Sequence, residues 1–197
     1  NDIQEGLENA FPPAGWQTTG TGNLSWGNAT TVGGFGTSAN SMVADNYNVN
    51  GGGTTCDMIA AIDLSAVTSN WLTFDVAYAR WSGAYLDSLE VLVSTDCGIT
   101  WNTVYFKGDT DLATAPDFSS AEFVPTASEW RTDSIDMTSY LGEDFLSIAF
   151  RNHGNWSQML YVDNINLGNQ ALAIEADPPK EWISFYPNPV AVNGQLK

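Results

Sequence analysis

The residue types that carry out catalysis are sparse in this chain of 197 residues. His153 is the only histidine, and it lies in a predicted turn rich in Gly and Asn. A hydrolytic triad needs a histidine as general base, and the chain has no Gly-x-Ser-x-Gly sequence around a nucleophile. A glycosidase needs only two carboxylates about 5 to 10 Å apart, but 23 Asp and Glu residues would supply such a pair by chance. We therefore expect that this chain is not an enzyme and has no catalytic residue.

Aromatic side chains are better candidates for a functional site. The chain has eight Trp and seven Tyr, and four of these fall in or beside predicted loops: Trp81, Tyr85, Trp156 and Tyr161. Flat, exposed aromatic rings are platforms for sugar rings and for protein partners. The alternative is that these rings fill the open ends of a β-sandwich. The sequence leaves both roles open.

Short alternating runs show which elements position these residues. Apolar and polar residues alternate over 72–78, 89–93 and 146–150, which is the period of half-buried strands. Gly, Asn, Asp and Pro residues between such runs indicate turns, and only 136–141 is predicted to form a short helical turn. Strands without helical crossovers predict an all-β fold, an antiparallel β-sandwich of the jelly-roll kind.

Two polar segments are predicted to be loops, because they are rich in Gly, Asn, Ser and Thr and lack core residues of their own. They span residues 18–44 and 46–55. A long loop in a compact domain is usually functional or held by a ligand such as a metal.

The charge of the chain limits its partners. Six Lys and Arg against 23 Asp and Glu give a net charge of −17, which repels nucleic acid and anionic membranes. No apolar run reaches the roughly 18 residues of a membrane span, so we expect no membrane insertion. Cations are the natural partners of such a chain.

A family resemblance follows from motifs spread over the chain. A Pro-x-Gly-Trp turn ends at Trp16, and a Ser-Thr-Asp-Cys-Gly-x-Thr-Trp hairpin ends at Trp101. With the segments 62–65, 72–78 and 161–167, these motifs resemble cleaved-adhesin and choice-of-anchor domains over roughly residues 5–167. Such domains are jelly rolls similar to MAM and galactose-binding domains. They occur in surface adhesins and as accessory modules behind secreted peptidases.

The resemblance implies a structural calcium site where the terminal strands pair. Carried over to this chain, Glu8 supplies a first-strand carboxylate and Asp163 a last-strand carboxylate. Asn40, with carbonyls of Ser38 or Ser41, would come from the long loop, and Asp87 is a further candidate. Calcium suits such a site because it accepts six to eight oxygen ligands at flexible angles. The alternative is that these are ordinary exposed or hydrogen-bonded carboxylates.

The end of the chain resembles a secretion signal. Residues 182–197 contain a Tyr-Pro-Asn-Pro run ending at Pro189 and an Asn-Gly turn beginning at Asn193, as at the start of the C-terminal sorting domain of type IX secretion cargo from Bacteroidetes. The alternative is a Pro-rich turn that enters a strand. We thus expect a jelly-roll domain over 1–167, a linker over 168–181 and the truncated start of a sorting domain over 182–197. The resemblance implies a secreted or cell-surface fragment that engages the type IX secretion machinery.

An exported location affects two further predictions. Cys56 and Cys97 would most simply form a disulfide, with two separate thiols as the alternative. Ser88 and Ser134 lie in Asp-Ser-apolar sequences, which resemble the O-glycosylation sites of exported Bacteroidetes proteins.

The sequence thus predicts a non-catalytic, calcium-supported module for adhesion or for recognition of extracellular glycan or protein. The alternative is an accessory domain of a larger secreted hydrolase, such as a peptidase. A third reading is a spacer without a ligand.

Overall fold

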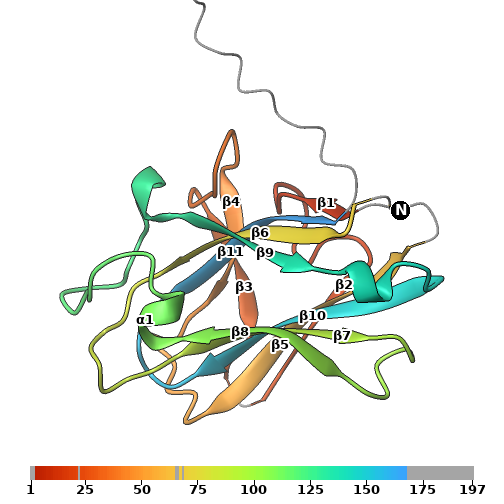
Figure 1. Cartoon of the computed structure of the whole chain (residues 1–197). Coiled ribbons are helices and arrows are strands. Elements are labelled where there is room, and N and C mark those ends of the chain that lie inside the picture. The colour runs from red at the N-terminus through yellow and green to blue at the C-terminus, as the bar shows by residue number, and fades with distance from the viewer. Residues whose placement is uncertain (1–2, 22, 65–66, 68, 168–197) are drawn as a thin grey trace, which may run out of the picture.

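The computed structural model describes residues 3–21, 23–64, 67 and 69–167 as two stacked antiparallel sheets (Figure 1). One sheet has the order β3 (Trp26–Thr30), β4 (Asn40–Ala44), β11 (Leu160–Leu167), β6 (Trp71–Tyr78) and β9 (Arg131–Asp136), and β1 (Ile3–Glu5) also pairs with β11. The other has the order β2 (Trp16–Gly20), β5 (Thr54–Asp63), β10 (Phe145–Gly154), β7 (Ser88–Ser94) and β8 (Asn102–Gly108). The helical turns of the described residues are α1 (Asp109–Leu112), η1 (Ala127–Glu129) and η2 (Thr138–Tyr140).

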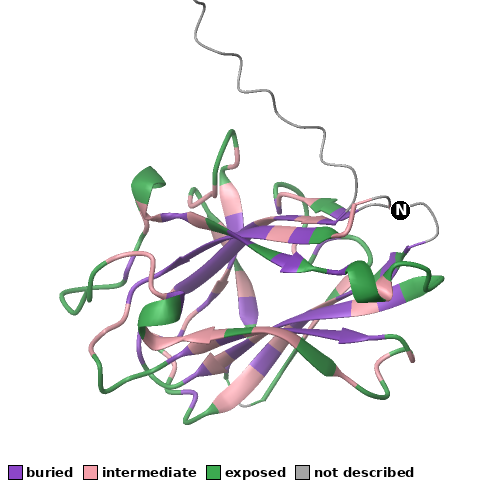
Figure 2. Ribbon diagram, viewed as in Figure 1, coloured by how far each residue is buried: buried purple, intermediate pink, exposed green. Residues whose placement is uncertain are grey.

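This architecture confirms the predicted jelly-roll β-sandwich. The alternating runs form β6, β7 and β10, and the helical turn predicted near residue 138 is η2. Their apolar side chains face the space between the sheets, where Phe74, Val91 and Phe150 are fully buried. Figure 2 shows this burial as purple strand segments that face one another, with exposed residues mainly in the loops. The predicted linker and sorting domain, 168–181 and 182–197, lie outside the described residues.

The prediction of one continuous loop over 18–44 was wrong, because β3, β4 and the end of β2 lie within it. Both β2 and β3 are outer strands of their sheets. An outer strand has one hydrogen-bonded neighbour and buries few side chains, so Trp26 is the only buried residue of β3. Such a strand has too little apolar alternation to be recognised in the sequence.

The predicted disulfide was also wrong, since Cys56 and Cys97 are separate free thiols. Cys56 lies opposite Asn152 of β10, and Asn152 lies opposite Leu89 of β7. Cys97 lies beyond Ser94, at the other end of β7. The five residue-to-residue steps from 89 to 94 along β7 span about 17 Å. A disulfide needs Cα atoms within about 7 Å, so the sheet keeps these cysteines too far apart.

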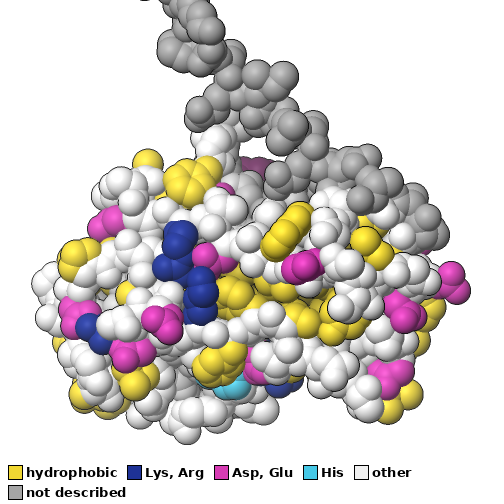
Figure 3. Space-filling model, viewed as in Figure 1, with side chains coloured by type: hydrophobic (Ala, Val, Ile, Leu, Met, Phe, Trp, Pro, Cys, Tyr) yellow, Lys and Arg dark blue, Asp and Glu magenta, His cyan; other side chains and the backbone are white. Residues whose placement is uncertain are grey.

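One edge of the sandwich is open between β9 and β8. Figure 3 shows a strip of hydrophobic side chains there, with basic and acidic side chains side by side next to it. Across this edge, Asp133 of β9 pairs with Lys107 of β8 at 3.0 Å, and within β9 it pairs with Arg131 at 2.9 Å. Within the residues that the structure describes, no helix combines the length and apolar character of a transmembrane segment.

Candidate functional site

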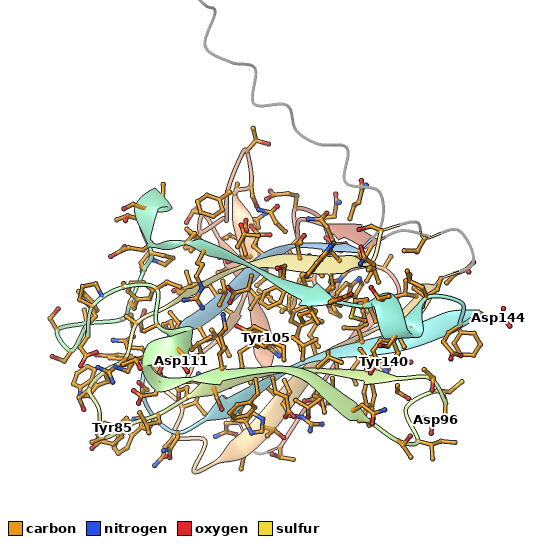
Figure 4. The ribbon with its side chains drawn as sticks, in the orientation of Figure 1. Tyr85, Asp96, Tyr105, Asp111, Tyr140 and Asp144 are labelled. Atoms are coloured by element: carbon orange, nitrogen blue, oxygen red, sulfur yellow. The ribbon has the colours of Figure 1, made fainter. Side chains whose placement is uncertain are left out.

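Aromatic side chains gather where three loops meet at one end of the sandwich. Tyr85 lies at this end, opposite the end that carries Asp96 and Asp144 (Figure 4). The β4–β5, β6–β7 and β10–β11 loops form a groove of about 510 Å³ here. We call it the aromatic groove, and it is lined by Tyr47, Asn48, Trp81, Tyr85, Trp156 and Ser157.

The rings of the aromatic groove form two pairs. The centroids of Tyr47 and Trp81 are 5.7 Å apart, and those of Tyr85 and Trp156 are 6.0 Å apart in an edge-to-face arrangement. Trp156 remains 50% exposed and Tyr85 36% exposed. Three of the four predicted platform residues therefore come together. Tyr47, which sequence reasoning missed, joins them from the segment predicted as the second loop.

The backbone of Trp156 is in an unusual conformation. Its φ is 59°, in the left-handed region that a bulky residue rarely occupies. Such a conformation costs about 1 to 3 kcal/mol and persists only where the surroundings impose it. Because the side chain is half exposed, burial does not recover this cost. Strained backbone conformations of this kind are common at ligand sites.

Asp87 organises the groove from below. Its carboxylate is fully buried and accepts the backbone N–H groups of Asn155 at 2.6 Å and Gln158 at 3.1 Å, on either side of Trp156. Burial raises the pKa of Asp87 to about 6, against the opposing effect of these hydrogen bonds. The structure places Asp87 with this loop and does not bring it together with Glu8, Asn40 and Asp163, the other predicted calcium ligands.

Ser157 connects two of the groove loops. Its hydroxyl accepts the backbone N–H of Trp81 at 2.9 Å and the phenol O–H of Tyr78 at 3.0 Å. The β6–β7 loop and the β10–β11 loop therefore share one buried hydroxyl, which fixes Trp81 relative to Trp156.

The third loop is held by a pair of buried amides. Asn46 and Asn152 are both fully buried and exchange two side-chain hydrogen bonds, of 3.0 and 2.8 Å. This pair fastens the β4–β5 loop to β10 immediately before Tyr47 and Asn48. All three groove loops are thus fixed to the sandwich by buried polar contacts.

Tyr161 does not belong to the groove, so its prediction as an exposed platform was wrong. It is 3% exposed, and its hydroxyl donates to the carbonyl of Phe123 at 2.8 Å. Its ring packs against Phe123 and Trp130. Tyr161 faces the outer side of its sheet, which the segment from α1 to β9 covers. A covering segment of this kind leaves no pattern near Tyr161 in the sequence.

A second polar site lies where β1 pairs with β11. Glu8 accepts the backbone N–H of Ala39 at 2.6 Å, the backbone N–H of Asn40 at 3.0 Å and the amide of Asn40 at 3.1 Å. The hydroxyl of Ser38 lies 2.7 Å from Glu8 and 2.6 Å from Asp163. The structure therefore brings together Glu8, Asn40 and Asp163, as the resemblance implied. We call this set, with Asp75, the carboxylate cluster.

Asp75 is the member of the carboxylate cluster that sequence reasoning missed. It lies directly opposite Asp163 across β6 and β11, next to a register shift in β11. The amide of Asn164 donates to Asp75 at 2.7 Å, and the backbone N–H of Gly34 donates to Asp163 at 2.6 Å. A Cβ atom on Gly34 would lie 2.8 Å from the Asp75 carboxylate, so only glycine allows this approach.

The charge of the cluster is compatible with a bound cation. Asp163 is 0% exposed and Asp75 is 4% exposed, and no Lys or Arg of the described residues pairs with either. Burial, and to a smaller extent the charge of Asp75, raise the pKa of Asp163. Two buried like charges with oxygen atoms nearby fit a hard cation such as calcium.

The donor set also limits the kind of metal. Among the described residues, no three His, Cys, Asp or Glu side chains converge closely enough to hold a metal by themselves. A cation would therefore need further oxygens from Ser38, Asn40, backbone carbonyls or water. Backbone N–H groups that now point at the carboxylates would have to give way. This set suits calcium, which accepts carbonyl and water ligands, and does not suit zinc.

His153 shows no catalytic arrangement. It lies within β10 and not in a turn, and its Nε2 is 2.9 Å from the carboxylate of Glu90. That carboxylate also accepts the hydroxyl of Thr103 and lies 3.9 Å from Arg151. His153 therefore belongs to a polar network with Glu90, Thr103 and Arg151 on the outer face of the sheet.

The two predicted glycosylation sites differ in accessibility. Ser134 is exposed on the outer strand β9, whereas Ser88 is half-buried between β10 and β8. Both remain predictions, and the structure favours Ser134 over Ser88 for access by an enzyme.

Comparison with known proteins places the fold in a class. No family model matches the chain, and no curated protein matches it. Among solved structures, the K1 cleaved adhesin domain of Lys-gingipain from Porphyromonas gingivalis W83 is similar, with 21% identity, 86% of this chain and 99% of that chain covered, and a TM-score of 0.57. The K2 cleaved adhesin domain has 18% identity, coverage of 85% and 98%, and a TM-score of 0.59.

Carbohydrate-binding modules share the same architecture. The TmCBM61 structure in complex with beta-1,4-galactotriose has 12% identity, covers 85% of this chain and 100% of that chain, and has a TM-score of 0.51. At such identities the likeness establishes the fold. The jelly-roll sandwich of this chain is therefore the one found in cleaved adhesin domains and carbohydrate-binding modules.

Proposed function

We propose that this chain is a non-catalytic extracellular binding module that recognises glycan through the aromatic groove. The observation that carries the proposal is the exposed Trp156, held at a φ of 59° beside Tyr85. Sugar rings stack on flat aromatic faces, and neither the fold nor the core needs this ring in solvent. The solved modules that share the fold include one described in complex with beta-1,4-galactotriose, which supports a glycan over a protein ligand.

Calcium is part of the proposal as a structural ion. Glu8 and Asp163 would supply carboxylate oxygens, and Ser38, Asn40, backbone carbonyls or water would supply the remaining oxygens. The ion would neutralise the buried charges and fix the loop between β3 and β4 against β1. Nothing in the cluster resembles a catalytic base, so the ion would act on stability and not on a reaction.

Export is the remaining part of the proposal. The tail at 182–197 resembles a type IX sorting domain, so the secretion machinery would be a partner and the cell surface the destination. The likeness to cleaved adhesin domains supports an extracellular location.

A second candidate is an accessory domain of a larger secreted hydrolase. The similar K1, K2 and K3 structures are each described as one domain of Lys-gingipain, so this fold occurs as a part of a longer protein. Residues that precede this chain in a longer protein would distinguish the two candidates. A His-Glu-x-x-His helix there favours a peptidase, and further copies of this module favour an adhesin.

A glycan array tests the proposal directly. The wild-type domain should bind a restricted set of glycans, and Trp156→Ala should abolish that binding. Trp71→Ala is the matched control, because Trp71 is 47% exposed and lies at the start of β6, the strand whose other end leads to the groove. Loss of binding in both variants, or in neither, would refute the aromatic groove as the site. Absence of any glycan binding would favour the protein-ligand or spacer reading.

A further inference from the structure

A second pocket adjoins the aromatic groove. It has a volume of about 460 Å³ and shares Asn48 with the groove as a lining residue. We call it the amide pocket, and its lining residues are Thr21, Asn23, Leu24, Asn48, Val49, Asn50, Gly51 and Thr54. Its polar residues are amides and hydroxyls, and none of its lining residues carries a charge.

Two amides of this pocket, those of Asn48 and Asn50, are oriented and partly unpaired. The Nδ2 atom of Asn48 donates to Asp45 at 3.1 Å and to Glu122 at 2.8 Å, which settles which end of the amide is oxygen. Its Oδ1 atom has no partner among the described residues. The Oδ1 atom of Asn50 accepts the backbone N–H of Gly52 at 3.0 Å. The Nδ2 atom of Asn50 is therefore the donor end, and it has no hydrogen-bond partner among the described residues.

The wall that carries these amides is fixed. The backbone N–H of Gly53 donates to the carbonyl of Gly154 at 2.9 Å, and the backbone N–H of Thr54 donates to the carbonyl of Gly51 at 2.8 Å, which closes a turn. A Cβ atom on Gly51 would lie 2.5 Å from that Gly154 carbonyl oxygen, so the loop packs directly on β10. Amides on a fixed wall bind sugar hydroxyls at a small cost in conformational entropy.

We infer that the amide pocket is a second subsite for the same glycan, so that the ligand is a neutral oligosaccharide of at least two sugar units. One sugar ring stacks on the aromatic side chains of the groove. The neighbouring sugar unit extends past Asn48 into the amide pocket and hydrogen-bonds to the amides. Neutral sugars fit because Asp45 and Glu122 flank the junction and repel an acidic sugar. This inference rests on the proposed glycan function and names the class and length of the ligand.

Affinity measured against ligand length tests the second subsite. The probes are neutral β-1,4-linked galacto-, gluco- and xylo-oligosaccharides of one to four units, titrated into the wild-type domain. Affinity should rise steeply at the length that reaches past Asn48. The Asn23→Ala, Asn50→Ala double variant should lose about 2- to 12-fold per hydrogen bond for the long probes and leave the shortest bound probe unchanged.

The outcomes separate the inference from the proposed function. Asn102→Ala, an exposed asparagine at the start of β8, is the matched control and should change nothing. If the double variant loses affinity equally for probes of all lengths, or loses none, the second subsite is refuted and the proposal for the aromatic groove is unaffected. A wild-type domain that binds none of the probes overturns the ligand class inferred here. If the wild-type domain also binds no glycan on the array, the proposed function is refuted as well.

The neutral character of the ligand has its own test. A tetramer with one uronic acid unit should bind more weakly than its neutral counterpart at low salt. The difference should shrink at 1 M salt, where the Debye length is about 3 Å. Equal binding at low salt would overturn the preference for neutral sugars.

Discussion

Replacing Asp87 by asparagine should change how stability depends on pH. In the folded domain, burial raises the pKa of Asp87 from its ordinary value of 3.8 to about 6. The folded state therefore holds this proton more tightly than the unfolded state does. Protonation of Asp87 stabilises the fold as the pH falls from about 6 toward 3.8, and this stabilisation is absent above pH 6.

The magnitude follows from the shift. A difference of about two pKa units corresponds to about 3 kcal/mol over the whole window, since each unit is worth about 1.4 kcal/mol. Roughly 2 kcal/mol of this falls between pH 4 and pH 7. Asp87 is fully buried, so solvent screening does not reduce the effect. The direction is opposite to that of a carboxylate with a lowered pKa, such as Asp133.

The assay is urea unfolding of the wild type and of Asp87→Asn at pH 7, 6, 5 and 4. Asparagine keeps one acceptor oxygen but points an amide donor at the backbone N–H groups, which adds a cost that does not depend on pH. The other carboxylates are common to both proteins and cancel in the difference. Relative to the wild type, the variant should gain about 2 kcal/mol from pH 4 to pH 7. If the difference in unfolding free energy between the variant and the wild type does not change with pH, or changes with the opposite sign, the buried position of Asp87 beneath the groove is refuted.

Three further outcomes follow from the contacts of the described residues. Millimolar calcium at about 100 times its dissociation constant should raise the melting midpoint by about 5 to 10 °C over EDTA, but not in Asp163→Asn; equal midpoints for the wild type would reject the ion. Asn46→Ala should cost about 2 kcal/mol in urea unfolding, because it leaves the buried amide of Asn152 unpaired, and a loss below 0.5 kcal/mol would contradict that pairing. In native protein, iodoacetamide should label the exposed Cys97 and spare Cys56, whose pKa burial raises to about 12; the mass of unlabelled protein should show no disulfide.

Much of the fold could be predicted because alternation is a local property. Residues 72–78 and 146–150 each show it, and β6 and β10 are the result. The outer strand β3 could not be predicted, since it buries only Trp26. Its position depends on pairing with β4, which no pattern within β3 shows.

The candidate site could be predicted only in part, for a similar reason. Glu8 and Asp163 were found through a resemblance that carries information on tertiary contacts. Asp75 occupies a position that reads as part of an ordinary strand, and it becomes a site residue only because it lies opposite Asp163. Tyr161 was predicted as an exposed platform and is buried, whereas Tyr47 lines the groove and was not predicted. The sequence could not show this, because burial of a tyrosine depends on which distant segment covers it.

The most direct measurement is a titration of the tryptophan indole N–H signals by NMR. The probes are β-1,4-galactotriose, cellotriose and xylotriose, with signals assigned from single Trp→Phe variants. The indole signals of Trp81 and Trp156 should shift with at least one probe, whereas those of Trp71 and Trp101 should stay fixed. Shifts confined to Trp71 or Trp101, or no shift with any of the probes, would contradict glycan recognition in the aromatic groove.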